Sequence, residues 1–176
     1  MQRSGTLALL ALTGALALAG CQSSNRNEDR LYVARPVERL YMSGTDDLEL
    51  KRYSDAVAAF NEVERQHPYS EWAQRSTLMS AFASYKANHY EEAIDTARRY
   101  IGLHPGSDEA SYAYYIVAVS YFDQIMDVGR DQETTEYAKS ALVDVTRRFP
   151  DSEYAKDAQI KIDMVNDQLA GKEMAI

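Results

Sequence analysis

One short phrase occurs three times in this chain of 176 residues: residues 67–73 read HPYSEWA, residues 104–110 read HPGSDEA, and residues 149–155 read FPDSEYA. Successive copies lie 37 and then 45 residues apart. A recurrence at intervals of about 20 to 50 residues is typical of repeat proteins, in which each copy marks the same point of one structural unit. The phrase therefore predicts a stack of similar units.

The prolines of the three phrases align a second pattern that lies upstream of each. The residues 15, 12 and 8 positions before each proline are large or polar, then alanine, then apolar. Apolar residues three and four positions apart indicate helices with one buried face, and the alanine marks a close approach of two helices. The pattern predicts an all-α, tetratricopeptide-like right-handed superhelix of antiparallel helix pairs, with about three and a half repeats. The aligned residues are Tyr53, Ala56 and Phe60; Tyr90, Ala93 and Ala97; and Thr135, Ala138 and Leu142.

The phrase itself is interpreted as a joint between repeats. Its proline ends the second helix of one repeat, because proline can neither continue nor donate to the helical ladder. Ser70, Ser107 and Ser152 are predicted N-caps of the following helices. An acidic residue follows each serine, where the helix dipole favours negative charge.

The repeats are expected at about 37–68, 70–105 and 107–150, with a half repeat at 152–170 inside a domain covering 37–176. In the first repeat the helices are expected at 37–50 and 54–66, and the last helix at 152–169. The third repeat carries extra residues, MDVGRDQETT at 126–135, which are expected between its two helices, with a turn at Gly129. No partner helix is expected after the last one.

The N-terminus has the pattern of a targeting segment. Residues 1–20 are expected to be a signal peptide, since the apolar run at 7–18 is too short for the roughly 20 residues that span a bilayer. The run ends in Leu18-Ala19-Gly20-Cys21, which resembles a bacterial lipobox. Cys21 is then expected to carry an N-acyl group and an S-diacylglycerol, and residues 21–36 to form a tether. The alternative is an ordinary secretory signal in which the cysteine is incidental.

Charge and motif content exclude several classes of function. The formal net charge of −8 argues against binding nucleic acid or anionic lipid headgroups through the protein surface. Cys21 is the only cysteine, and the three histidines are far apart in the sequence. There is no glycine-rich phosphate loop, no G-x-S-x-G and no identifiable acid–base pair. No catalytic residue, metal or other cofactor is expected.

The residues resemble one family closely, the BamD lipoproteins of the outer-membrane β-barrel assembly machinery. The resemblance implies a non-enzymatic subunit, anchored in the outer membrane by its lipid and facing the periplasm. Gln22, after the lipobox cysteine, also favours the outer membrane by resemblance. The segments that carry the resemblance are RPVERLY (35–41), HPYSEWAQR (67–75), SYAYYIVAVSYFDQI (111–125), DVGRDQ (127–132), RRFPDSEYAKDA (147–158) and LAGKEM (169–174).

The family further implies partners. Its members have five repeats, work with BamA and other subunits of the machinery, and assist unfolded outer-membrane β-barrel proteins. Their C-terminal repeats dock on BamA, whereas this sequence ends at Ile176. It is therefore either a fragment or a product without the docking half. A periplasmic repeat adaptor of a cell-wall or cell-division complex is the alternative function, because P-x-S-x-[YW]-A occurs in such proteins too.

The first helices of stacked pairs usually line the concave, peptide-binding face. An unfolded barrel strand would place apolar side chains on aromatic rings and pair its terminal carboxylate with a cation. The alternative for each ring is packing between repeats, and for each cation a solvated surface. The predicted groove residues are Tyr41, Arg75, Leu78, Phe82, Tyr85, Lys86, Tyr112, Tyr115, Val119 and Phe122.

Arg130 and Asp131, in the extra segment, are candidates for contact with a partner subunit. The alternatives are a solvated loop or an ion pair that holds the segment on repeat 3.

Overall fold

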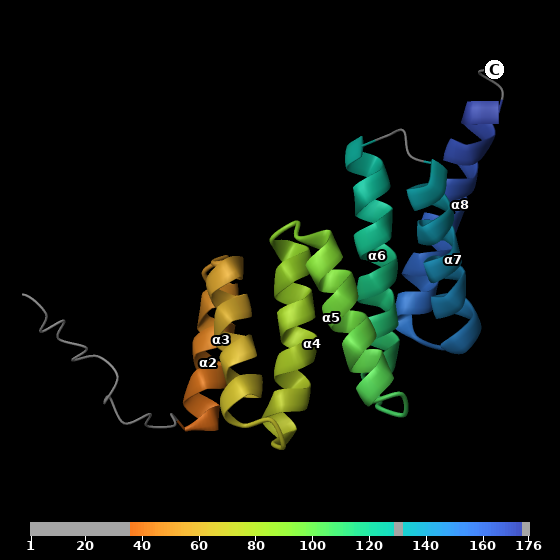
Figure 1. Cartoon of the computed structure of the whole chain (residues 1–176). Coiled ribbons are helices and arrows are strands. Elements are labelled where there is room, and N and C mark those ends of the chain that lie inside the picture. The colour runs from red at the N-terminus through yellow and green to blue at the C-terminus, as the bar shows by residue number, and fades with distance from the viewer. Residues whose placement is uncertain (1–35, 129–131, 174–176) are drawn as a thin grey trace, which may run out of the picture. The chain divides into compact units, whose positions relative to one another are not determined.

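The computed structural model describes residues 36–128 and 132–173. Within these ranges the chain is entirely helical, without a strand (Figure 1). The seven helices are α2 (Val37–Glu49), α3 (Tyr53–Gln66), α4 (Glu71–Lys86), α5 (Tyr90–Leu103), α6 (Ala110–Val128), α7 (Gln132–Arg148) and α8 (Glu153–Glu173).

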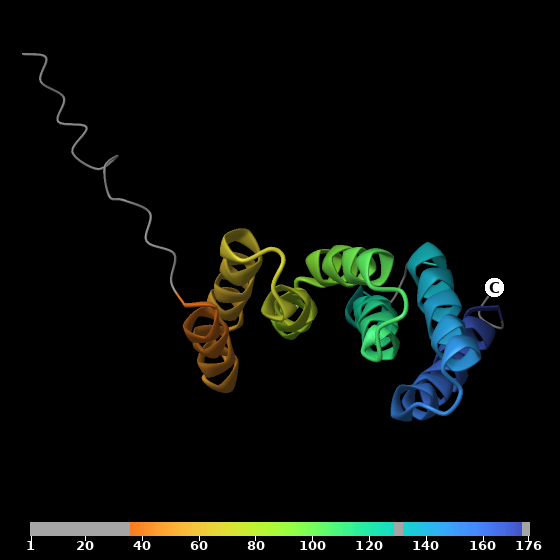
Figure 2. The ribbon, with the colours of Figure 1, turned by 90° about the horizontal axis from the view of Figure 1, so that it is seen from below.

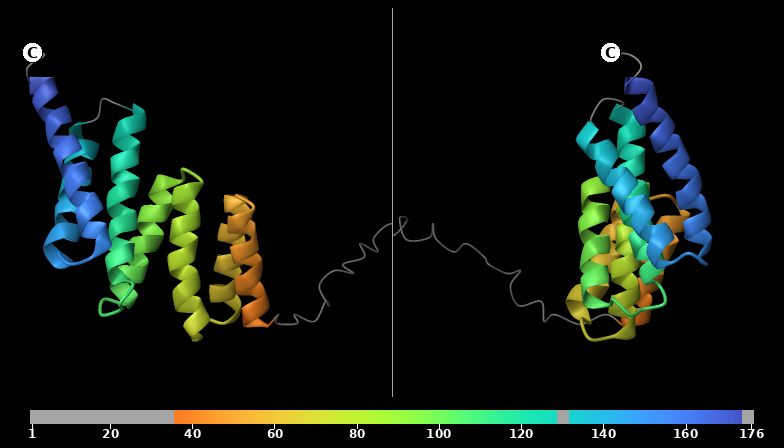
Figure 3. Two further views of the ribbon diagram at one scale, coloured as in Figure 1. Left: turned by 180° about the vertical axis from the view of Figure 1, so that it is seen from behind. Right: turned by 90° about the vertical axis from the view of Figure 1, so that its right-hand side faces the viewer.

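The helices pack as consecutive pairs, α2 with α3, α4 with α5 and α6 with α7, followed by the single helix α8 (Figures 1 and 3). Each helix contacts its neighbours in sequence, and α2, α4, α6 and α8 also contact one another in that order. We call these four the A helices, and α3, α5 and α7 the B helices. Figure 2 shows the same succession of helix pairs from below. The predicted all-α tetratricopeptide-like class is confirmed.

The aligned alanines lie where the helices approach most closely. Ala56, Ala93 and Ala138 are completely buried. Gly44 in α2 has the same role on the facing side, since a Cβ added there would lie 2.7 Å from the ring of the buried Phe60. Larger apolar side chains such as Phe60, Tyr100 and Leu142 pack around these small residues in the core. The small residues thus set the spacing of the stack.

Two of the three joints have the predicted cap. Ser70 accepts a hydrogen bond from the backbone N–H of Ala73 at 3.1 Å, and Ser152 accepts one from that of Ala155, also at 3.1 Å. Each serine hydroxyl also donates to the backbone carbonyl three residues earlier, at 2.8 Å. The proline-to-serine phrase therefore closes one helix and caps the next.

The prediction for the second joint is wrong in detail. Helix α6 begins only at Ala110, so Ser107 is not its N-cap. Its hydroxyl donates to the Glu109 carboxylate at 2.5 Å, accepts from the Glu109 N–H at 3.1 Å and lies 2.8 Å from the Tyr100 hydroxyl. These local partners hold a turn ahead of the helix.

The extra segment of repeat 3 also differs from the prediction, because most of it is helical. Helices α6 and α7 have 19 and 17 residues, compared with 16 in α4 and 14 in α5. Residues 126–128 continue α6, and residues 132–135 begin α7. Ile125 and Thr135 are buried, so the helical packing continues to both ends of the segment. Gly129 and the predicted turn lie outside the described residues.

The last helix is longer than expected, and among the described residues no helix covers one of its apolar sides. It runs to Glu173, four residues beyond the predicted end. Ile160 and Met164 are 62% and 46% exposed. By the register of Ser70 and Ser152, they correspond to Leu78 and Phe82 of α4, which pack in the core shared with α5.

Candidate functional site: the aromatic face of the A helices

The A helices bring three of the six predicted aromatic residues together in one cluster. The rings of Phe82 and Tyr112 are 6.3 Å apart between centroids, and Tyr112 lies 5.2 Å from Tyr154. Tyr154 also lies 5.1 Å from Tyr115. These four rings form one cluster across α4, α6 and α8, which we call the A-face cluster.

Tyr154 is a member that sequence reasoning missed. It occupies the position in FPDSEYA that Trp72 occupies in HPYSEWA. Trp72 in turn lies 4.9 Å from Tyr41 of the preceding repeat, and Tyr41 lies 5.5 Å from Phe60. At two of the three joints, the sixth residue of the phrase therefore contributes an aromatic ring that contacts a tyrosine of the preceding A helix. At the second joint this position is Glu109, and the ring is absent.

Two tyrosine hydroxyls link successive A helices. Tyr85 of α4 donates to Asp123 of α6 at 2.6 Å, and Tyr115 of α6 donates to Asp157 of α8 at 2.5 Å. Lys161 donates to the same Asp157 oxygen at 2.6 Å. Sequence reasoning did not identify either aspartate, because residues 38 and 42 positions away from a tyrosine give no local signal.

These contacts change proton affinities in both directions. Burial, followed by the hydrogen bond to Asp123, raises the pKa of Tyr85, and burial and Asp157 do the same for Tyr115. Burial also raises the pKa of Tyr112. Burial acts to raise the pKa of Asp157 too, but the hydrogen bonds from Lys161 and Tyr115 outweigh it, so this pKa lies below its usual value. The hydroxyls are therefore neutral donors at neutral pH.

The two predicted cations, Arg75 and Lys86, are both exposed on α4. Eleven residues separate them, which is about three turns or about 16 Å along the helix. Eleven residues also bring them back to nearly the same side. Arg75 lies with its guanidinium carbon 6.0 Å from the Trp72 ring centroid. At this separation a single carboxylate cannot contact both cations.

Three other predicted groove residues belong to the core. Leu78, Val119 and Phe122 are only 7%, 3% and 5% exposed. Leu78 packs in the cluster shared with α5, and Phe122 packs in the one shared with α7 and α8. A ligand on the A face would meet the tyrosines and not these side chains.

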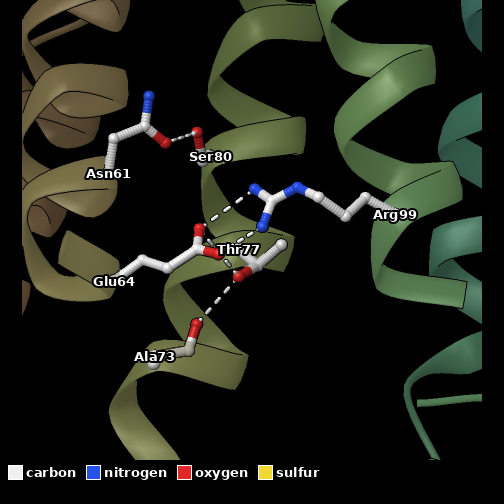
Figure 4. Close-up of polar contacts among 6 residues, drawn as sticks. All are labelled: Asn61, Glu64, Ala73, Thr77, Ser80 and Arg99. Carbon is white, nitrogen blue, oxygen red and sulfur yellow. Dashed lines mark hydrogen bonds and ion pairs between the residues drawn. The ribbon is translucent and has the colours of Figure 1, made fainter. Parts of the chain in front are cut away.

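The first two repeats are joined by a polar bridge that includes residues of the B helices, on what we call the B side (Figure 4). Arg99 of α5 donates through both terminal nitrogens to Glu64 of α3, one of these bonds being 3.0 Å long. Thr77 of α4 lies 3.4 Å from the same carboxylate and donates to the Ala73 carbonyl at 3.0 Å.

Beside this bridge, Ser80 donates to Asn61 at 2.8 Å. Side chains of three successive helices are thus joined by hydrogen bonds at the boundary between the first and second repeats.

Several predicted positions lie outside the described residues: Cys21 and the signal peptide, and the partner-contact candidates Arg130 and Asp131. Within the described ranges, no helix combines the length and hydropathy needed to cross a membrane. The same part of the chain holds no group of three or more histidine, cysteine, aspartate or glutamate residues arranged to bind a metal ion.

Comparison with known proteins identifies similar sequences along nearly the whole chain. The profile of a family named YfiO and described as outer membrane lipoprotein matches residues 33–176. The outer membrane protein assembly factor BamD of Caulobacter vibrioides is 54% identical over 168 residues, which are 96% of this chain and 55% of that protein. BamD of Rickettsia prowazekii is 40% identical over 176 residues, or 100% of this chain and 68% of that protein. The chain thus spans little more than half the length of the Caulobacter relative.

Among solved structures, the chain is similar to the TPR domain of Arabidopsis OM64, with a TM-score of 0.56 and 12% sequence identity. The match covers 73% of this chain and 94% of that domain. At this identity the likeness supports the tetratricopeptide fold alone.

Proposed function

The chain belongs to the YfiO family of outer membrane lipoproteins, and from this we propose that it is a non-enzymatic subunit of the outer-membrane β-barrel assembly machinery. The observation that carries the proposal is the 54% identity to an outer membrane protein assembly factor over 96% of this chain. In this role the chain binds targeting peptides of unfolded barrel proteins and contacts BamA and other subunits. A lipid on Cys21 holds it at the periplasmic side of the outer membrane.

The A-face cluster supports the peptide-binding part of this role. Barrel strands alternate apolar with polar residues, so one face of an extended strand presents apolar side chains about 7 Å apart. Phe82, Tyr112 and Tyr154 succeed one another at 6.3 and 5.2 Å. Tyrosine suits such a surface, since it offers apolar area together with a polar tip. The tyrosine hydroxyls remain protonated and so add no negative charge that would repel a carboxylate.

The two cations on α4 make the proposal specific. Since Arg75 and Lys86 are about 16 Å apart, one terminal carboxylate can pair with only one of them. Arg75 lies beside Trp72, whose ring provides a site for a terminal aromatic residue. We assign the carboxylate to Arg75 and the body of the strand to the A-face cluster.

Peptide binding by the purified chain tests this assignment. The probe is a fluorescent decapeptide of alternating apolar and polar residues that ends in phenylalanine with a free carboxylate. Arg75→Glu is expected to weaken its binding about tenfold, because an attractive charge pair becomes repulsive. Lys86→Glu is expected to have a smaller effect. Amidation of the peptide should abolish the difference between wild type and Arg75→Glu.

Lys139→Glu, on α7, is the matched control and should leave the affinity for this peptide unchanged. Equal affinities of wild type, Arg75→Glu and Lys86→Glu for the free-acid peptide would remove the proposed carboxylate site.

The alternative function is an adaptor of a cell-wall or cell-division complex. The proline-serine joint fits both functions, whereas the 54% and 40% identities are to outer membrane protein assembly factors. The proteins that co-purify with the chain distinguish the two.

A further inference from the structure

A second aromatic surface lies away from the A-face cluster, between α5, α6 and α7. It is a cavity of about 290 Å³. Its apolar wall includes Ile101, Val117 and Ala141. We call it the B-side pocket. Its volume lies at the lower limit of small-ligand pockets, which run from about 300 to 1,000 Å³, so it fits one large side chain better than a whole cofactor.

Three tyrosines complete the wall of the B-side pocket: Tyr114 and Tyr121 from α6 and Tyr137 from α7. Tyr121 and Tyr137 lie 5.7 Å apart between ring centroids. Tyr137 is 49% exposed. The tyrosine-rich helix α6 thus supplies rings to two surfaces, with Tyr112 and Tyr115 in the A-face cluster and Tyr114 and Tyr121 here.

Two arginines stack on these rings. The guanidinium carbon of Arg98 is 5.6 Å from the Tyr121 centroid, and Nη2 of Arg98 donates to the Tyr121 hydroxyl at 3.1 Å. That of Arg148 lies 5.1 Å from the Tyr114 centroid. Both arginines are exposed, and neither forms an ion pair with a carboxylate in the part of the chain that the structure describes. Stacking orients a guanidinium while its remaining N–H groups stay available to a carboxylate.

The carboxylates beside the pocket do not neutralise the arginines. Asp144 pairs with Arg147 at 2.5 Å, and Glu133 accepts a hydrogen bond from the Tyr137 hydroxyl at 2.7 Å. These two carboxylates are outnumbered by the three arginines at positions 98, 147 and 148. The surface therefore has a local positive charge on a chain whose net charge is −8. A partner that approaches this spot is favoured if it is acidic, and it is repelled by most of the remaining surface.

We propose that the B-side pocket docks an acidic peptide segment of a partner protein, which inserts one aromatic or large aliphatic side chain between the tyrosines and pairs flanking carboxylates with Arg98 and Arg148. An aromatic side chain in a pocket beside a guanidinium is the usual composition of a binding hot spot. The surface differs from the A-face cluster in its residues, its position and the charge pattern that it selects. A repeat with two such surfaces can hold two partners at once.

The test measures binding of a pentapeptide with one phenylalanine between two pairs of glutamates, capped at both ends and fluorescently labelled. The full chain, purified in mild detergent, is expected to bind it at least tenfold more tightly than the same peptide with lysines in place of the glutamates. Replacing the phenylalanine by alanine should reduce binding severalfold.

Three variants locate the binding site. Arg98→Glu combined with Arg148→Glu should weaken binding of the acidic peptide at least tenfold. Ser140→Trp, at an exposed position of the pocket wall, should weaken it about fivefold by filling the cavity without a change of charge. Arg75→Glu, on the A face, should not affect it. Circular dichroism and thermal unfolding are to be measured for each variant to check that it is folded.

Equal binding of the acidic and basic peptides overturns the proposal, and so does unchanged binding in the double arginine variant. A second copy of this chain is the competing occupant of the pocket. In that case the mass of the wild-type chain rises with concentration, the acidic peptide does not reverse the rise, and Ser140→Trp abolishes it. This result also overturns the proposal. Because the peptide is capped, the outcome is independent of the free-carboxylate peptide assigned to Arg75.

Discussion

Single small residues determine how closely the helices of this chain approach. Gly44 faces the ring of Phe60 so closely that a Cβ at position 44 would lie 2.7 Å from the nearest ring atom. In the register set by the joints, the equivalent positions of the next two A helices are Ala81 and Ala118, both completely buried. The first helix pair therefore has no room for the methyl group that the later pairs accommodate at this position.

Gly44→Ala is expected to lower the free energy of unfolding by about 1–2 kcal/mol. Overpacking against a buried ring costs about 1–3 kcal/mol, and the gain of about 1 kcal/mol in helix propensity offsets only part of it. Urea denaturation followed by circular dichroism measures the change. Gly102→Ala is the control, since Gly102 is helical with no atom near the new Cβ, and it should stabilise by up to about 1 kcal/mol. Equal stability of the two variants would contradict the close approach.

At the scale of residues, the sequence predicted the positions that follow the repeat and missed those that depend on distant partners. Ser70 and Ser152 cap as expected, because a cap is a local interaction. Ser107 does not, because Glu109 and Tyr100 take its hydroxyl. Tyr154 was recognisable from its equivalence with Trp72, whereas Asp157 was not.

Helices of different repeats are joined by both apolar packing and polar bridges. The Glu64–Arg99 pair connects α3 to α5 across α4. The two side chains are 31% and 43% exposed. Such partly exposed pairs contribute little to stability, and we expect this one to act mainly on how the first repeat is oriented relative to the second.

A double-mutant cycle with Glu64→Gln and Arg99→Met measures this bridge. We expect a coupling energy of about 0.5–1 kcal/mol at low salt, at the upper end for exposed pairs because the contact is bidentate. It should decrease in 1 M salt, where charges are screened beyond about 3 Å. A coupling energy of zero at low salt would show that the bridge contributes nothing to the joining of the repeats.

The tyrosines between the A helices predict a two-step alkaline titration. Raised pKa values mean that Tyr85, Tyr112, Tyr115 and Tyr154 favour the folded state below the unfolded pKa of about 10. That stabilisation is lost as the pH rises through their folded pKa values. The ultraviolet absorbance of tyrosinate should therefore show a late step that coincides with the loss of helical circular dichroism.

Tyr112→Phe should reduce the amplitude of the late absorbance step by the contribution of one tyrosine. A single titration of all tyrosines that is complete while the helical signal remains intact would contradict the packing of these rings.

The lengths of the helices in repeat 3 show the limit of reasoning about elements from sequence. The extra ten residues contain Gly129 and several polar side chains, which indicate a loop. The structure instead lengthens α6 and α7, because buried residues such as Ile125 and Thr135 extend the contact between the two helices. One or two apolar positions are too few to show a helical period, so the sequence did not predict the longer helices.

At the scale of the whole molecule, the repeat determines the fold and the side chains of its two faces determine what it binds. The A face presents a tyrosine cluster with Arg75 and Lys86, and the B side presents a smaller pocket flanked by Arg98 and Arg148. Family membership agrees with the sequence resemblance. The groove assignment was only partly predictable from spacing, since Leu78, Val119 and Phe122 lie in the core.

Under the proposed function, the chain is a scaffold that assembles other proteins and carries out no chemistry of its own. The proposal that matters most is that this scaffold works in the outer-membrane barrel assembly machinery. Repeat adaptors of cell-wall complexes share the fold, so partner identity separates the two roles and stability does not.

Affinity purification of the tagged full chain from native envelopes in mild detergent, followed by mass spectrometry, decides between these roles. We expect recovery of a membrane β-barrel protein of the assembly machinery, together with unfolded barrel clients, and loss of the clients but not of the membrane partner in Arg75→Glu. Recovery of cell-wall or cell-division proteins without any β-barrel protein would contradict the proposed role.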